Sequence, residues 1–252
     1  MTDDQVTQAA NLLVEARRTG NRISSLPDSC KPSTPEDAYA IQDAVAARLG
    51  AVGGWKVGAG SPQAEPACAP MPADLIFRSE QHPSYAASPG TEVETEIAFL
   101  LGADLPPRDV PYTVKDVVAA VASVHAAIEL VDSRFADRRS VDRLSLLADS
   151  LSNGAFVLGS GQKGKRRVDQ TTQPAVLYFD DRKVADTVGG NPAGDVYRIF
   201  AWLANHVAKH YGGLRAGQIV TTGSCTGMVP VAPSARVLGR LAGIGEVEVA
   251  ID

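Results

Sequence analysis

Apolar and polar residues follow two different rhythms along this chain, and the change falls near residue 50. Within residues 3–19 and 35–49, apolar side chains recur every three or four positions, the spacing of one buried helix face. From residue 51 onward, short apolar or alternating runs are separated by glycine and proline, which is typical of β-strands. We therefore expect a single α+β domain, with a helical N-terminal part at residues 1–50 and a β-rich core at residues 51–252.

Residues that favour helix ends mark the two N-terminal helices. Asp3 is the expected N-cap of the first helix. Thr34, with Asp37 three residues later, forms a capping-box start for the second. Gln42 is expected to be a surface or edge residue of that second helix. A further amphipathic helix is expected over residues 193–211.

Carboxylates stand in the middle of an otherwise apolar strand at residues 91–102, TEVETEIAFLLG. Successive side chains of a strand point to opposite faces, so Glu92, Glu94 and Glu96 share one face. Burying such acids is unfavourable unless a cation accompanies them. An acidic face that simply lies in water is the alternative interpretation, because this pattern also occurs in exposed antiparallel strands.

A second apolar segment, AAIELVDSRF at residues 126–135, contains one further acid, Glu129. Three acids in two neighbouring apolar strands are harder to explain as surface residues than one acid alone. Oxygen ligands favour a hard divalent ion, whereas a soft metal would require cysteine or histidine, which the acidic strand lacks. We expect Glu94, Glu96 and Glu129 to bind magnesium first and manganese second.

A lone lysine, Lys56, lies between apolar Trp55 and Val57 in GGWKVGAGS. If the ammonium points inward, desolvation lowers its pKa while nearby carboxylates raise it, and such a lysine can exchange protons or bind an oxyanion. The alternative is a side chain whose ammonium reaches water. Prolines are frequent over residues 59–74, so we expect a mobile loop there, covering the region that Lys56 faces.

Two segments rich in small polar residues are candidates for substrate contacts. One is ADSLSNG, which contains Ser152, and the other is QIVTTGSCTGMVPV, which contains Thr222. The first could line a polar pocket or form only a turn. The second ends in a loop of glycines and hydroxyl residues, which binds anions through backbone N–H groups.

Composition narrows the function classes. The chain has 252 residues, 44% of them hydrophobic, and a net charge of −5, which argues against a nucleic-acid partner. No apolar run approaches the length of a membrane helix, and the N-terminus has no secretory signal pattern, so we expect a cytoplasmic protein. The chain has three cysteines at wide, irregular spacing, which fits neither a disulfide framework nor a zinc site.

Taken in order, the motifs resemble those of the 2-keto-4-pentenoate hydratase family within the fumarylacetoacetate hydrolase superfamily, over nearly the whole chain. They are GWKVG, EVETEIAFLL, AAIELVDSR, ADSLSNGAFVLG, GNPAGDVYRIFAWLAN and IVTTGSCTGMVPV. The resemblance implies a rolled mixed β-sheet with peripheral helices and a magnesium or manganese ion on Glu94, Glu96 and Glu129. It also implies a functional lysine at Lys56 and a functional serine at Ser61.

The chain departs from the family pattern at three positions. An arginine usually precedes the Glu-x-Glu motif, where this chain has Glu92, and a histidine usually stands at Asn191. The aspartate that usually follows the segment near Phe77 is absent or shifted to Asp74. These differences leave the substrate open.

The resemblance implies a hydratase that adds water to a 2-hydroxy-2,4-dienoate, giving a 4-hydroxy-2-oxo acid in the breakdown of aromatic compounds. A decarboxylase of the 4-oxalocrotonate type would use similar chemistry. A hydrolase of acylpyruvates would need a histidine base, for which His82 and His125 are the candidates. A binding subunit without activity, assisting a partner enzyme of the same pathway, is the alternative from another class. We also expect a homo-oligomer.

Overall fold

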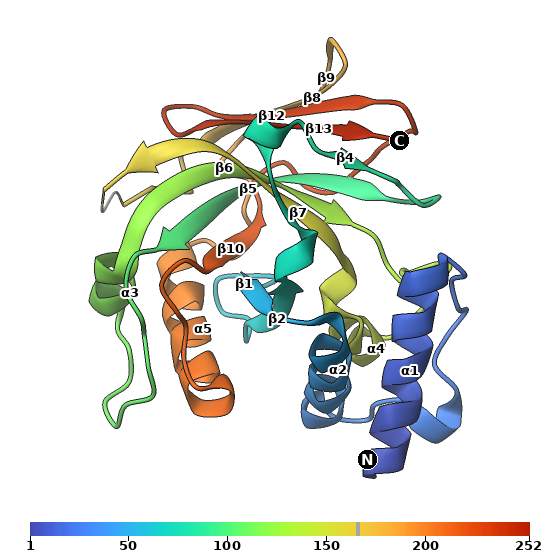
Figure 1. Cartoon of the computed structure of the whole chain (residues 1–252). Helices are drawn as coiled ribbons and strands as arrows, with labels where there is room; N and C mark the ends of the chain where they lie inside the picture. The colour runs from blue at the N-terminus through green and yellow to red at the C-terminus, as the bar shows by residue number, and fades with distance from the viewer. Residues whose placement is uncertain (165–166) are drawn as a thin grey trace.

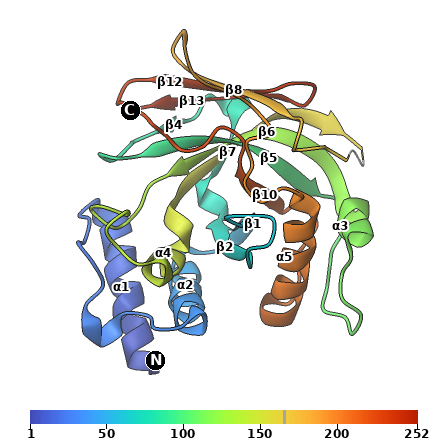
Figure 2. The same ribbon diagram turned by 180° about the vertical axis from the view of Figure 1, so that it is seen from behind.

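The computed structural model describes residues 1–164 and 167–252 and contains two β-sheets stacked on each other. Figure 1 shows the smaller sheet lying across the strongly curved larger sheet at the top of the view, and the helices below. Figure 2 shows the same arrangement from behind. The expected α+β class and rolled mixed sheet are confirmed.

The larger sheet has the strand order β2-β1-β10-β5-β6-β7-β3, with β11 also paired to β5. It is mixed, because β1 runs parallel to β10 and β3 parallel to β7. Its strands are β1 (Val52–Gly58), β2 (Ala67–Pro72), β3 (Ile76–Arg78), β5 (Glu92–Leu101), β6 (Val121–Val131), β7 (Asn153–Lys163), β10 (Ile219–Ser224) and β11 (Val229–Pro230).

The smaller sheet has the order β4-β13-β12-β8-β9. Its strands are β4 (Ser84–Tyr85), β8 (Pro174–Phe179), β9 (Arg182–Val188), β12 (Arg236–Leu241) and β13 (Gly245–Ile251). The α-helices are α1 (Asp3–Thr19), α2 (Pro35–Leu49), α3 (Val114–Ala120), α4 (Arg143–Ala148) and α5 (Val196–Tyr211). Single 3-10 turns form η1 (Asp28–Cys30), η2 (Ala73–Leu75), η3 (Ser79–Gln81) and η4 (Ser150–Ser152).

The N-terminal helices begin where side chains satisfy their first backbone N–H groups. The capping box of α2, in which Thr34 and Asp37 bond reciprocally, is confirmed. For α1 the expected N-cap is wrong by one residue, because Thr2 rather than Asp3 accepts from the N–H of Gln5. Gln42 is also not a surface residue: it is completely buried and donates to the backbone carbonyl of Leu147.

The segment at residues 59–74 is more ordered than expected. Its second half forms β2, which pairs antiparallel with β1, including Lys56 opposite Ala69. β2 lies at the edge of the larger sheet, where a proline such as Pro70 removes no ladder hydrogen bond from a central strand. The loop after β1 is therefore shorter than expected and ends near Pro66.

The hydrophobic core lies between the two sheets and under α5. β5 and β6 run side by side through its centre, and Phe99 of β5 contacts both Tyr197 and Phe200 of α5. A separate apolar cluster joins α1, α2 and α4, with Phe135 completely buried in it. No helix in the described part of the chain has the length and hydrophobicity needed to cross a membrane.

Candidate metal and catalytic centre

Three carboxylates meet where β5 and β6 pair. Glu94 lies directly opposite Glu129 in the antiparallel register, and Glu96 follows Glu94 on the same face of β5. One oxygen from each of the three lies within 4.8 Å of the others. Glu96 and Glu129 are almost completely buried, and Glu94 is partly exposed. The alternative of an acidic face in water is therefore wrong for this part of β5.

Burial and mutual repulsion make this cluster unfavourable without added positive charge. Burial, reinforced by the charge of Glu129, raises the pKa of Glu94 to about 7. The same causes raise the pKa of Glu96 well above its ordinary range. The Oε2 atom of Glu129 is buried and has no hydrogen-bond partner among the described residues. An oxygen-only donor set with an unpartnered carboxylate oxygen fits a hard divalent cation.

Lys56 points into the same cluster from β1. Its ammonium donates to Glu129 Oε1 and, over 3.1 Å, to the backbone carbonyl of Leu151. Burial acts to lower the pKa of Lys56, but the charges of Glu129 and Glu94 outweigh it and raise that pKa. The side chain is only 12% exposed, so the alternative in which the ammonium reaches bulk water is wrong.

Two hydroxyl residues of β10 contact the carboxylates and were not predicted from the sequence. Thr221 donates to Glu96 Oε2, and the hydroxyl of Ser224 bonds to Glu94. β10 pairs antiparallel with β5, with Thr221 opposite Ala98 and Ser224 opposite Glu96. A signal existed in the sequence, because TTGS follows an apolar run, but only the register decides which hydroxyl faces the acids.

The three candidate substrate-binding residues lie in three different parts of the fold. Ser61 accepts a hydrogen bond from the N–H of Ala64 and so forms a turn in the loop after β1. Thr222 is buried and accepts from Gln170, on the strand face opposite to that of Thr221. Ser152 lies in η4, the turn that also supplies the Leu151 carbonyl.

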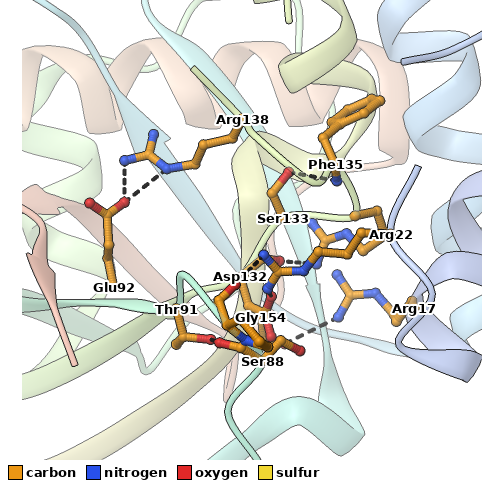
Figure 3. A network of polar contacts seen from close by, with 12 residues as sticks. Arg17, Arg22, Ser88, Thr91, Glu92, Asp132, Ser133, Phe135, Arg138 and Gly154 are labelled. Carbon is orange, nitrogen blue, oxygen red and sulfur yellow. Dashed lines mark hydrogen bonds and ion pairs between the residues drawn. The ribbon is translucent and has the colours of Figure 1, made fainter. Parts of the chain in front are cut away.

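The departures from the family pattern have local structural explanations. Glu92 does not join the three acids; it forms ion pairs with Arg138 and Arg139, and Figure 3 shows the Arg138 guanidinium directed at its carboxylate. Asn191 donates to the backbone carbonyls of Thr222 and Gly223. Two arginines from the segment after β6 therefore neutralise the acid that stands before the Glu-x-Glu motif.

The histidines proposed as bases are not part of the cluster. Both ring nitrogens of His125 are hydrogen-bonded, one with the Ser123 hydroxyl and the other with the Gly159 carbonyl. His82 caps η3, outside the larger sheet. Asp74 is exposed in η2, so it does not replace a buried acid.

The comparison with known proteins agrees with the architecture. Residues 38–252 match the family model described as fumarylacetoacetate hydrolase, C-terminal. A 2-keto-4-pentenoate hydratase of Paraburkholderia phymatum is 31% identical, covering 97% of each chain. A 2-hydroxyhexa-2,4-dienoate hydratase of Comamonas testosteroni is 28% identical, again over 97% of each chain.

Among solved structures, 4-oxalocrotonate decarboxylase from Pseudomonas putida G7, complexed with magnesium and adipate, superimposes with a TM-score of 0.85. It is 25% identical, and the match covers 100% of this chain and 99% of that one. The matched family model covers most of the chain, and the hydratase relatives match almost all of it. This chain belongs to the fumarylacetoacetate hydrolase family, in the branch of the 2-keto-4-pentenoate hydratases.

Proposed function

We propose that this chain is a hydro-lyase that adds water to a 2-hydroxy-2,4-dienoate in the breakdown of aromatic compounds. The observation that carries the proposal is the cluster of Glu94, Glu96 and Glu129 with Lys56, buried in a fold shared with enzymes of this chemistry. The support from relatives is consistent, because hydratases acting on such dienoates match nearly the whole chain.

The three carboxylates would hold one divalent cation, for which we propose magnesium, with manganese as the substitute. The support is the oxygen-only donor set, together with the magnesium in the structure of the related decarboxylase. When bound, the cation supplies a Lewis acid that stabilises negative charge on the substrate oxygens. Thr221 orients Glu96, and Asn153 donates to Glu129 Oε1, so the ligands are held before the cation arrives.

Lys56 would act on the substrate itself. Among the described residues, the ammonium donates to Glu129 and Leu151, so one of its three N–H groups remains for a substrate oxygen. During ketonisation a proton leaves the 2-hydroxyl group and a proton is added at C5. Water then adds across C3 and C4, with its hydroxyl group going to C4 and a proton to C3. A donor held at the C2 oxygen stabilises the negative charge that develops there.

A decarboxylase acting on a 2-oxo-3-enedioate is the second candidate, favoured by the similarity to the decarboxylase structure. Both reactions pass through the same kind of delocalised anion, and the products separate them. The test is to incubate the protein and magnesium with each substrate and to identify products by NMR. A hydratase should convert the dienoate into a 4-hydroxy-2-oxo acid. Loss of carbon dioxide from the enedioate, without hydration of the dienoate, would support the decarboxylase. A protein inactive on both substrates, while binding them, would support a binding subunit.

We further propose that the chain assembles as a homo-oligomer, as expected from the apolar helix faces around a rolled sheet. Light scattering should then give a mass above the 26.4 kDa of one chain. A mass of one chain at assay concentrations contradicts this part of the proposal.

A further inference from the structure

The turn before β7 adopts an unusual backbone conformation. Ser150, Leu151 and Ser152 have φ values of 51°, 53° and 61°, so three consecutive residues other than glycine are left-handed. Left-handed conformations are unfavourable for such residues and persist only where the surrounding structure enforces them. Such strained conformations cluster at active sites and ligand-binding sites.

This turn contacts the carboxylate and lysine cluster at two points. The carbonyl of Leu151 accepts from the Lys56 ammonium at 3.1 Å. The side chain of Asn153, the next residue after the turn, donates to Glu129 Oε1 at 3.3 Å. The turn and the residue after it therefore supply one hydrogen-bond partner to Lys56 and one to Glu129.

A buried arginine bonds to both ends of the turn. The guanidinium of Arg134 donates to the carboxylate and the backbone carbonyl of Asp149, on one side of the turn. It also donates to the Asn153 carbonyl on the other side, at 2.8 Å. Arg134 is 5% exposed and Asp149 is 3% exposed, so these charge-assisted bonds are shielded from water.

A second arginine reaches the same place from the N-terminal helix. Arg17, in the last turn of α1, donates to the carbonyls of Asn153 at 2.5 Å and Gly154 at 3.1 Å. Figure 3 shows its guanidinium directed at Gly154, beside the Asp132 and Arg22 pair. Residue 17 lies outside the region 38–252 that matches the family model, so α1 adds this contact to the matched domain.

We propose that Arg17 is a positioning residue: from α1 it fixes the left-handed turn at residues 150–152 and thereby orients Lys56 and Glu129 for the reaction. The proposal rests on the proposed function of the cluster. It assigns a role in that centre to a helix that contributes no side chain to the carboxylate cluster.

The test compares the full-length variants Arg17→Met and Arg17→Lys with Arg18→Met. Arg18 is the matched control, because it lies on the same helix and its ion pair with Glu15 is exposed to solvent. The measurements are kcat and KM for the dienoate, the Kd for magnesium by calorimetry, and amide hydrogen exchange of residues 149–154. All are made well below the melting temperature of each variant.

For Arg17→Met we expect kcat to fall about 10-fold or more, with KM changed less than about 3-fold, because remote supports of a metal site contribute on this scale. We also expect about 10-fold weaker magnesium binding and faster exchange at residues 149–154. A lysine provides a single ammonium in place of the two-pronged guanidinium, so Arg17→Lys should lie between Arg17→Met and wild type. Arg18→Met should match wild type in all three measurements.

The proposal is overturned if Arg17→Met lowers only the melting temperature and keeps the wild-type kcat, magnesium Kd and exchange rates. If Arg17→Met does not fold, Arg17→Lys decides, and its identity with wild type in all three measurements contradicts the role. A wild-type protein that fails to convert the dienoate refutes the proposed function instead. In that case magnesium binding and hydrogen exchange still test whether Arg17 fixes the turn.

Discussion

Glu94 of β5 and Glu129 of β6 lie directly opposite each other in neighbouring antiparallel strands, with Lys56 bonded to the second of them. Like charges at such a position destabilise a sheet pair. A bound divalent cation that offsets this repulsion accounts for the arrangement.

Glu96→Gln should abolish stabilisation by magnesium. Wild-type protein at a magnesium concentration 100 times the Kd gains about 2.7 kcal/mol against unfolding. The variant loses a ligand oxygen and one negative charge of the donor set, so its melting temperature should not respond to magnesium. Thermal unfolding with and without the ion measures this, with the exposed Glu15→Gln as the control. An unchanged response in Glu96→Gln would remove Glu96 from the metal site.

Without a divalent ion, stability should fall as pH rises through the window in which Glu94 loses its proton. Its pKa is raised from 4.5 to about 7, because burial and Glu129 disfavour the charged form. The folded state thus binds more protons than the unfolded state in this window, and the free energy of unfolding decreases as pH rises from about 4.5 to 7. Other groups also titrate there, so the difference between wild type and Glu94→Gln is the quantity to measure. Urea unfolding in EDTA at several pH values should show a shallower decrease for the variant, and equal slopes would contradict the assignment.

The two adjacent threonines of β10 form a matched pair. Thr221→Val removes the hydroxyl that donates to Glu96 and should weaken magnesium binding about 10-fold, the scale of a lost ligand support. Thr222→Val removes a hydroxyl that bonds to Gln170 on the other face. Calorimetry with magnesium should therefore separate the two variants. Weaker binding in Thr222→Val but not in Thr221→Val would reverse the assignment of faces.

Lys56→Met should preserve the magnesium affinity to within a small factor and slow the chemical step about 100-fold or more, the usual scale for a lost oxyanion donor or acid–base group. Single-turnover measurement of dienoate consumption tests the step directly. Lys115→Met, at the start of α3, is the control. Near-normal turnover in a folded Lys56→Met would exclude this side chain from the mechanism.

The charged core of the site could be predicted from the sequence, because Glu94, Glu96, Glu129 and Lys56 each interrupt an apolar strand. The hydroxyl supports could not be assigned in the same way. Thr221 and Thr222 are identical neighbours, and only pairing with β5 decides which one faces the acids. The motif indicates Thr222 as a candidate because a sequence motif contains no information about that register.

The left-handed backbone of the turn before β7 could not be predicted from the sequence either. Leu151 is left-handed without being glycine, and its role comes from a carbonyl that every residue has. Gln42 is expected at the surface because polar residues usually lie there, yet in the interior its side-chain NH2 group donates to the carbonyl of Leu147, in a helix far away in the sequence. Such contacts depend on tertiary packing and leave no local pattern.

If this chain hydrates a dienoate with a divalent cation held by Glu94, Glu96 and Glu129, its activity must depend on that cation. The most direct measurement follows the ultraviolet absorbance of 2-hydroxypenta-2,4-dienoate with the purified protein, first in EDTA and then with excess magnesium. We expect no loss of absorbance above the uncatalysed rate in EDTA, rapid loss with magnesium, and 4-hydroxy-2-oxopentanoate as the product. Equal catalysed rates in EDTA and in magnesium, or no loss of absorbance in either, would contradict this expectation.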